Sequence, residues 1–371
     1  MKSILSTILV ILLSASVAGA SGDYVSAMLM EARSGQILFE DNADESWIPA
    51  SVVKLMLLLL ADEALQAGKV TPKTMMTSSK LAKRMGGSQV YLAAGDETSF
   101  QKLIEAVAVG SANDAAVTVA EGIFGSVPAA VSAMNEKCVE LGMTNTVYVN
   151  VTGLPESGGR AENHTTAREQ AILAREVSLR HPRVFDWTGK IYTRFRPGLD
   201  LGTTNTLMKS YEGMDGLKTG YHVKGRSNLV ATAQRGGRRL IAVVLGSSGP
   251  KARNAEVVKL LDSGFAGWDM RTALRAGDGL GVEFPVKRTW RGKLRIHAGA
   301  DLVYLARPED MGRVSIELED PDELSAPIEA GEVVGRIVVK LDGRVLSSVP
   351  ALAAGRVRAS GLRWPSWGGG R

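Results

Sequence analysis

The chain has 371 residues, of which 45% are hydrophobic and 22% are charged, and its formal net charge at pH 7 is +5. These values fit a globular protein with a sizeable core and two or three domains. The small positive charge does not indicate a nucleic-acid partner, and the sequence has no zinc-ligand spacing, basic helix or aromatic stacking platform that would.

Residues 1–20 have the pattern of a secretory signal peptide. Lys2 precedes an apolar run from Ile4 to Leu13, and small residues at 18–20 form an A-x-A type cleavage site. The apolar run is shorter than the roughly 20 residues that span a membrane. An uncleaved N-terminal anchor is the alternative. Both interpretations predict a protein that works outside the cytoplasm, in the periplasm or on the outer face of the cytoplasmic membrane.

Residues 21–269 are predicted to form one α+β domain. Apolar runs at 24–30 and 36–39 flank a Ser34-Gly35 turn and predict a hairpin. Residues 51–66 are apolar on every face and predict a buried helix. From Gly213, three strand-like runs separated by glycine turns predict an antiparallel meander, followed by one more helix. Four further helices are predicted, at 100–109, 113–121, 128–141 and 166–179.

The helix predicted at 128–141 contains Cys138, the only cysteine of the chain, so no internal disulfide can form. We expect this side chain to be a small, buried apolar group. Because strands come first, helices follow and strands return, the first strands of the domain are expected to pair with the last.

The sequence pattern changes after residue 269. Residues 270–358 contain short alternating strands separated by Gly, Pro and Asp turns, which predict a small all-β domain. Residues 359–371 include Trp364 and Trp367 but have no helical period, so we expect a flexible tail. Contact of this C-terminal region with an anionic membrane or the cell wall is the alternative.

Ser51 and Lys54 stand at the start of the apolar helix. Residues i and i+3 of a helix share a face, so the hydroxyl and the amine are expected to lie side by side. A serine hydroxyl needs a base to become a nucleophile, and a lysine whose pKa is lowered by burial can be that base. In the alternative interpretation, Ser51 caps the helix and Lys54 extends to water.

Two further triplets follow in the chain. Ser111-Ala112-Asn113 lies on a loop that enters a helix, and Lys218-Thr219-Gly220 lies in a predicted strand. Taken alone, the first can be a helix cap and the second can carry a solvated lysine on a strand edge. However, S-x-x-K, S-x-N and K-T-G in this order form a motif set of β-lactamases and penicillin-binding proteins. The three segments therefore predict a single catalytic site.

The sequence resembles the low-molecular-mass penicillin-binding proteins, specifically the serine-type D-alanyl-D-alanine carboxypeptidases of the penicillin-binding protein 5 type. The likeness runs from about Tyr24 to Gly264 and is carried by "PASVVKLM", "GSANDAA", "DGLKTGYH" and "TTNTLM". It implies a β-lactamase/transpeptidase-like α+β catalytic domain, with an antiparallel sheet flanked by helices. The β-rich segment that follows fits the small C-terminal domain of this family.

The resemblance implies a role for each catalytic residue. Ser51 would attack the carbonyl of the terminal D-Ala–D-Ala bond of a peptidoglycan pentapeptide, and Lys54 would take the serine proton. Ser111 would relay a proton to the leaving D-alanine, and Asn113 would hold Lys54 and the substrate backbone. Water would then hydrolyse the acyl-enzyme, so neither a metal nor an organic cofactor is implied. β-Lactams are the expected inhibitors.

The same resemblance assigns Lys218, Thr219, Gly220 and Tyr221 to substrate binding. Lys218 would place its charge beside the substrate carboxylate, to which Thr219 would donate. The backbone N–H groups of Ser51 and Tyr221 would form the oxyanion hole, where one donor can be worth about 3–4 kcal/mol.

The chain departs from the family pattern at two places. The residue after Tyr221 is His222, where the family usually has Thr. The stretch after the last core strand has Ser247 and Ser248, where some members place an arginine for the substrate carboxylate. Arg253 is a candidate replacement for that arginine.

Other functions share the same motifs. A β-lactamase would need a glutamate in an E-x-x-L-N segment, and none occurs between Asn150 and Thr204. A transpeptidase would pass the same acyl group to an amine, but the chain lacks the long extra regions expected of a synthetic enzyme. A catalytically inactive penicillin sensor or wall-binding module has no need of the retained Ser51, Lys54 and Asn113.

Overall fold

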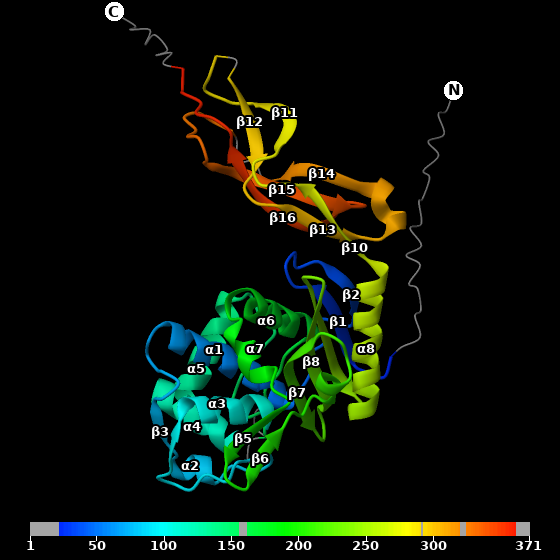
Figure 1. Cartoon of the computed structure of the whole chain (residues 1–371). Coiled ribbons are helices and arrows are strands. Elements are labelled where there is room, and N and C mark those ends of the chain that lie inside the picture. Colours follow the sequence, from blue (N-terminus) through cyan, green and yellow to red (C-terminus); the bar gives the residue numbers. More distant parts are fainter. Residues whose placement is uncertain (1–21, 156–161, 291, 320–323, 361–371) are drawn as a thin grey trace, which may run out of the picture.

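The computed structural model describes residues 22–155, 162–290, 292–319 and 324–360. The predicted signal peptide and residues 361–371 of the predicted tail lie outside the described residues. A larger unit of helices and one sheet is followed by a smaller all-β unit (Figure 1). This is the predicted α+β fold with an additional all-β part.

The larger unit is organised by a five-stranded antiparallel sheet in the order β2-β1-β9-β8-β7. The first strands pair with the last, as predicted; Met28 of β1 lies opposite Val243 of β9. One face of the sheet packs against α8 and the other against the remaining helices (Figure 1). The strands are β1 (Ser26–Glu31), β2 (Ile37–Asp41), β7 (Met214–His222), β8 (Arg226–Arg235) and β9 (Arg238–Ser247), and α8 spans Pro250–Gly267.

The helices between β2 and β7 include all those predicted, with ends that shift by at most three residues. They are α1 (Lys54–Gln66), α2 (Lys80–Lys83), α3 (Phe100–Val109), α4 (Asn113–Phe124), α5 (Val127–Glu140), α6 (Ala167–Arg180) and α7 (Arg183–Thr188). Short pairs β3 (Met75–Thr77) with β4 (Glu97–Ser99) and β5 (Tyr192–Arg196) with β6 (Leu199–Gly202), and the 3₁₀ helix η2 (Thr206–Lys209), complete the unit. Cys138 on α5 is buried, as predicted.

The helix predicted at 51–66 begins differently from the expectation. Residues Ala50–Val53 form a 3₁₀ turn, η1, and α1 starts only at Lys54. The tighter turn is closed by the N–H of Lys54, which donates to the carbonyl of Ser51 three residues earlier. Ser51 therefore lies in the turn that leads into α1 and not in the α-helix itself.

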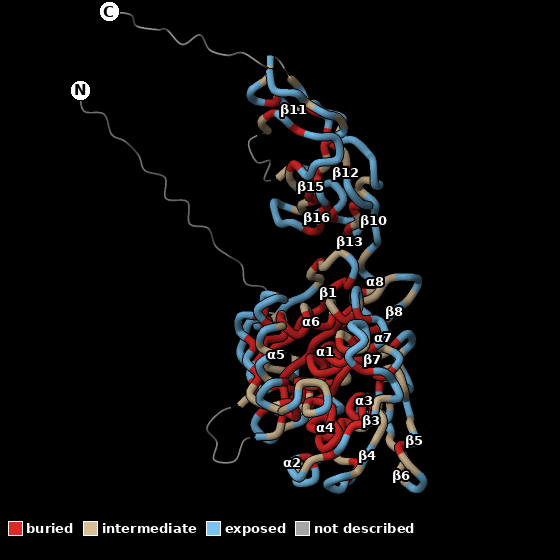
Figure 2. The backbone as a smooth tube through the Cα atoms, turned by 90° about the vertical axis from the view of Figure 1, so that its left-hand side faces the viewer, coloured by how far each residue is buried: buried red, intermediate tan, exposed pale blue. Residues whose placement is uncertain are grey.

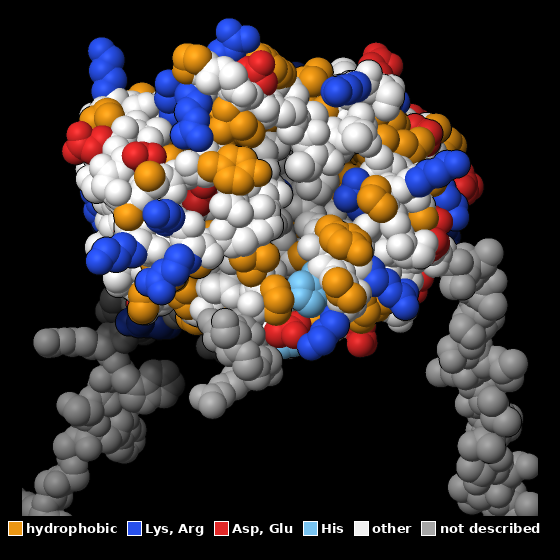
Figure 3. Space-filling view, turned by 90° about the horizontal axis from the view of Figure 1, so that it is seen from below, with side chains coloured by type: hydrophobic (Ala, Val, Ile, Leu, Met, Phe, Trp, Pro, Cys, Tyr) orange, Lys and Arg blue, Asp and Glu red, His pale blue; other side chains and the backbone are white. Residues whose placement is uncertain are grey.

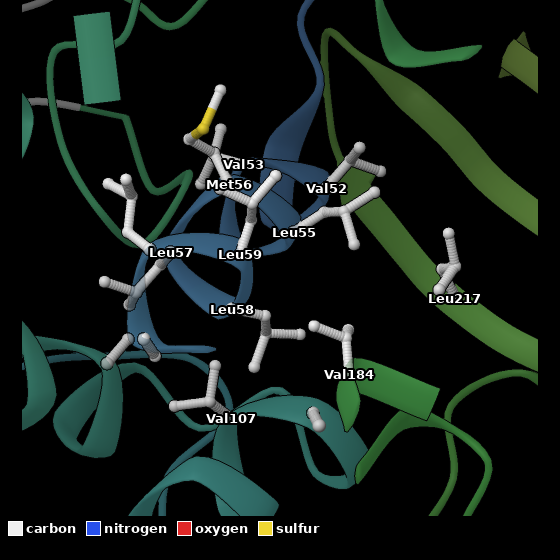
Figure 4. Close-up of a cluster of buried hydrophobic side chains, with 14 of the residues drawn as sticks. Val52, Val53, Leu55, Met56, Leu57, Leu58, Leu59, Val107, Val184 and Leu217 are labelled. Atoms are coloured by element: carbon white, nitrogen blue, oxygen red, sulfur yellow. The ribbon is translucent and has the colours of Figure 1, made fainter. Parts of the chain in front are cut away.

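Burial of α1 on all sides is confirmed. Its residues from Lys54 to Asp62 are all buried, and the helix runs through the buried centre of the unit (Figure 2). Leucines 55 and 57–59 pack among side chains of neighbouring elements, such as Val107 of α3 and Leu217 of β7 (Figure 4). The first residue of α1 is thus held at a fixed place in the core.

The smaller unit is all-β, as predicted. A five-stranded antiparallel sheet has the order β11-β12-β16-β15-β14, and β10 pairs with β13. Its apolar side chains form a separate core, which includes Ile296, Leu302 and Ile337. The elements are β10 (Asp269–Leu274), β11 (Gly279–Pro285), β12 (Lys293–Ala298), β13 (Leu302–Ala306), the 3₁₀ helix η3 (Pro308–Arg313), β14 (Val314–Glu319), β15 (Val333–Leu341) and β16 (Arg344–Ala353).

Within the described ranges, no single helix is long and apolar enough to cross a bilayer. Helices α4 and α5 meet the two criteria only as a joined pair, and they are bent by 82° relative to each other.

One side chain links the two units by a reciprocal pair of hydrogen bonds. The amide of Gln36, just before β2, donates to the carbonyl of Leu305 on β13 at 2.7 Å, and its oxygen accepts from the N–H of Leu305 at 2.7 Å. Both residues are buried. A second link, from Arg344 to Glu40 at 3.2 Å, is partly exposed.

Replacement of Gln36 by Met should weaken the junction, because it leaves the buried N–H and C=O of Leu305 without partners. Each of the two unpaired groups costs about 1–3 kcal/mol, so we expect the free energy of unfolding to fall by about 2–6 kcal/mol in urea denaturation. The matched control is Arg344→Gln, which removes an exposed ion pair and should cost less than about 1 kcal/mol. Equal stabilities of the two variants would contradict the assignment.

Candidate active site

The structure brings Ser51 and Lys54 together at the start of α1. The Nζ atom of Lys54 lies 2.9 Å from Oγ of Ser51, and the Lys54 side chain is completely buried. The Ser51 hydroxyl also lies 3.4 Å from the carbonyl oxygen of Thr152. The alternative interpretation, in which Lys54 extends to water, is therefore wrong.

The Lys54 amine has two further acceptors. Its Nζ atom lies 2.7 Å from Oδ1 of Asn113 and 2.6 Å from the carbonyl oxygen of Thr152. Burial, and after it the charge of Lys218, lowers the pKa of Lys54 well below that of an ordinary lysine. The amine can consequently lose its proton at a much lower pH than an exposed lysine would.

The second predicted segment contributes Ser111 and Asn113. Asn113 is the first residue of α4, and its Nδ2 donates to the carbonyl of Gly86 at 2.7 Å while its Oδ1 accepts from Lys54. These two contacts fix which way the amide points. Ser111 lies between α3 and α4 with φ of +59°, and its buried hydroxyl has no hydrogen-bond partner among the described residues. Such backbone strain is typical of functional sites.

The third segment lies on β7. Lys218 is buried, and its Nζ donates to the carbonyl of Thr219 at 2.9 Å. The hydroxyls of Thr219 and Thr204 are 2.6 Å apart. Burial, and after it the charge of Arg253, lowers the pKa of Lys218 to about 7. The alternative of a solvated lysine on a strand edge is therefore wrong for Lys218.

Two glycines, Gly220 on β7 and Gly153 next to Thr152, allow the backbone of their segments to approach the Ser51 turn. A Cβ atom on Gly220 of β7 would lie 2.4 Å from the carbonyl oxygen of Pro49 and 3.2 Å from the Ser51 nitrogen. Gly153 has φ of +79°, and a Cβ there would lie 2.1 Å from the carbonyl oxygen of Ala50. Backbone therefore packs directly on backbone on both sides of the nucleophile.

The structure shows the contacts of the two residues linked to departures from the family pattern, His222 and Arg253. Nδ1 of His222 accepts from the backbone N–H groups of Lys224 and Gly225, so the ring shapes the turn between β7 and β8. Tyr221 is 68% exposed, on the edge strand of the sheet. Arg253 is buried at the start of α8, where its Nη1 donates to the carbonyl of Asn228 at 3.4 Å. The face of the larger unit seen from below is hollowed near its centre (Figure 3).

Sequence reasoning missed the residues that act here through their backbone. The carbonyls of Thr152 and Gly86 orient Lys54 and Asn113, but a carbonyl is common to all residue types and gives no sequence signature. One sequence signal could have located Thr152. Oδ1 of Asn150 accepts hydrogen bonds from the N–H groups of Thr152 and Gly153, which forms an Asx turn. An Asn followed by a Gly three residues later can indicate such a turn.

The sequence of this chain is similar to those of known protein families and of individual proteins. Residues 15–249 match the family described as D-alanyl-D-alanine carboxypeptidase, and residues 269–359 match the C-terminal domain of penicillin-binding protein 5. The D-alanyl-D-alanine carboxypeptidase DacF of Bacillus subtilis is 36% identical over 342 residues, which cover 91% of this chain and 86% of that protein. DacC of Escherichia coli, a D-alanyl-D-alanine carboxypeptidase, is 31% identical over 351 residues and covers 92% of this chain and 86% of its own length.

The fold is also similar to solved structures of penicillin-binding proteins. The crystal structure of penicillin-binding protein 5 from Haemophilus influenzae superposes with a TM-score of 0.80 at 29% identity. The match covers 92% of this chain and 99% of that one, so both units of the fold are included.

The close approach at Gly220 can be tested by a single methyl group. Gly220→Ala should force β7 away from the Ser51 turn, and overpacking of this kind costs about 1–3 kcal/mol. The control is Gly202→Ala on β6, where a Cβ meets no atom within 4 Å. Thermal unfolding should show a lower midpoint for Gly220→Ala alone; matching midpoints would mean that the backbone contact is looser than described.

Proposed function

The chain belongs to the D-alanyl-D-alanine carboxypeptidase family and is a penicillin-binding serine carboxypeptidase, and from that premise we propose that it removes the terminal D-alanine of peptidoglycan pentapeptides through an acyl-enzyme on Ser51. The observation that carries the proposal is the 2.9 Å contact between Ser51 Oγ and a fully buried lysine amine. An amine held in this way can activate the hydroxyl.

The amine of Lys54 is the group suited to accept the proton of Ser51. A neutral Lys54 keeps two hydrogens, which it donates to Oδ1 of Asn113 and to the carbonyl of Thr152. Its lone pair then faces Ser51, whose hydroxyl becomes the donor. As the Ser51 oxygen bonds to the substrate carbonyl carbon, its proton moves to Lys54.

The other residues serve the tetrahedral intermediate and the leaving group. The backbone N–H groups of Ser51 and Tyr221 stabilise the oxyanion. Ser111, whose hydroxyl is unpartnered within the described structure, relays the proton to the nitrogen of the departing D-alanine. Water then hydrolyses the ester on Ser51 and regenerates the enzyme.

The substrate carboxylate is bound by cations and a hydroxyl beside β7. Lys218 and Arg253 are buried cations, and burial, followed by repulsion from Arg253, lowers the pKa of Lys218. An anion placed between them relieves that repulsion, which favours a substrate with a free C-terminal carboxylate. Thr219, on the same strand as Lys218, donates to this carboxylate, and the side-chain-free Gly220 leaves room for the extended substrate.

The cellular setting follows from the substrate. The protein is exported by its N-terminal signal peptide, acts in the periplasm or at the outer face of the cytoplasmic membrane, and contributes to cell-wall maintenance and cell shape. Residues 21–269 are the catalytic domain. Residues 270–358 and the tail place this domain at its substrate, with peripheral contact to the membrane or the wall.

Labelled penicillin tests the nucleophile. The purified protein should form a covalent adduct whose mass is that of protein plus penicillin, and Ser51→Ala should form none, because no other hydroxyl among the described residues contacts Lys54. The wild-type protein should also release D-alanine from a peptide that ends in D-Ala–D-Ala. Equal labelling of Ser51→Ala would exclude this nucleophile, and rapid penicillin turnover without D-alanine release would identify a β-lactamase.

The two buried lysines predict a bell-shaped dependence of kcat/KM on pH. Activity rises with pH as Lys54 loses its proton, and it falls as pH rises through about 7, where Lys218 loses the charge that binds the carboxylate. Arg253→Met removes a repulsive charge, so the pKa of Lys218 rises and the alkaline limb should move to higher pH.

The control for this shift is Lys224→Met. Lys224 is an exposed lysine on the β7–β8 turn that pairs with Glu162, and its loss should leave the alkaline limb in place. An alkaline limb that stays fixed in Arg253→Met would show that Lys218 does not set it.

A further inference from the structure

A buried carboxylate next to Asn113 controls the backbone of a neighbouring segment. Asp114 is 1% exposed, and its two carboxylate oxygens accept hydrogen bonds from the N–H groups of Val90 and Leu92 at 3.0–3.1 Å. Both of these residues point into the core. The residue between them, Tyr91, therefore points outward.

Tyr91 has two unusual properties. Its φ is +58°, in the left-handed region that side chains other than glycine rarely adopt, and it is 68% exposed although it is aromatic. The clamp by Asp114 holds it in this strained conformation. Arg196 of β5 also donates to the Tyr91 carbonyl, at 3.4 Å. Strain of this kind persists where the surroundings impose it, and it clusters at functional sites.

The segment that carries Tyr91 forms one wall of the catalytic site. The N–H of Asn113 donates to the carbonyl of Ser88 at 2.7 Å, and the Asn113 side chain donates to that of Gly86. Asn113 also contacts Lys54, so the segment is tied to the nucleophile through one residue. On the other side of Ser51, β7 presents a second exposed tyrosine, Tyr221.

We propose that Tyr91 is a specificity-determining residue, whose ring packs on the part of the stem peptide that precedes the D-Ala–D-Ala unit. This inference rests on the proposed function. The ring is held outward on a segment that contacts Asn113, and the clamp that holds it is Asp114, which follows Asn113 in the chain. At 68% exposure the ring has apolar surface free for a ligand. Asp114 acts as a positioning residue, because it sets the direction of the ring.

Tyr91→Gly separates a role in binding from a role in folding. Glycine adopts φ of +58° without strain, so the hydrogen bonds to Asp114 are kept and the midpoint of thermal unfolding should equal or exceed that of the wild type. Only the Tyr91 side chain is lost. Kinetics are compared on a pentapeptide that ends in D-Ala–D-Ala and on acetyl-D-Ala–D-Ala, which lacks the preceding residues.

The ratio of kcat/KM for the pentapeptide to that for the short substrate should fall about five- to tenfold in Tyr91→Gly, mainly through KM of the pentapeptide. Tyr91→Phe, which keeps the ring, should keep the ratio. The control is Trp290→Ala, which removes a 78% exposed aromatic from the smaller unit, and it should leave both kinetic values unchanged.

An unchanged ratio in Tyr91→Gly would overturn the inference, and so would an equal loss on both substrates, since a ring that acts on Ser51 would affect each alike. Failure of the wild-type protein to release D-alanine from either substrate would instead refute the proposed function. The two failures are therefore distinguishable.

Discussion

The site depends on one lysine amine that is kept away from water. Lys54 is buried at the start of α1, and its nitrogen is surrounded by a hydroxyl, a side-chain amide oxygen and a main-chain carbonyl. These groups accept hydrogen bonds but do not supply the negative charge that would hold the proton on the amine. The positive charge of Lys218 disfavours the proton further. Basicity is thus reduced by the same packing that forms the core.

The rest of the fold keeps that amine in place. The buried helix α1 fixes the lysine backbone, α4 supplies Asn113, and the edge strand β7 supplies the opposing charge. Close backbone approach at Gly153 and Gly220 leaves little room for the nucleophile turn to shift. Three residues other than glycine have positive φ in or near the segments that hold Ser51 and Asn113: Ala50, Tyr91 and Ser111. Strain of this kind costs about 1–3 kcal/mol per residue and is offset by the packing of the core around it.

Much of this could be predicted from the sequence. Apolar periodicity located α3 and α6, and the spacing of three short motifs identified the side chains that meet in the site. The 3₁₀ turn at Ser51 was not predicted, because its apolar residues fit an α-helix equally well. The carbonyls of Thr152 and Gly86 and the clamp by Asp114 depend on contacts between segments far apart in the chain. A periodicity or a motif reports local preference, and it does not report which backbone atom faces a distant side chain.

Titration of the Lys54 amine itself tests most directly whether burial lowers its pKa. NMR of the protein with isotopically labelled lysine side chains, assigned with Lys54→Arg, follows each amine separately. We expect Lys54 to lose its proton at a pH well below the pKa of about 10.4 that is typical of exposed lysines, and we expect Lys218→Met to raise this midpoint because a neighbouring charge is gone. A Lys54 that titrates together with the exposed lysines would show that burial does not make this amine a base for Ser51.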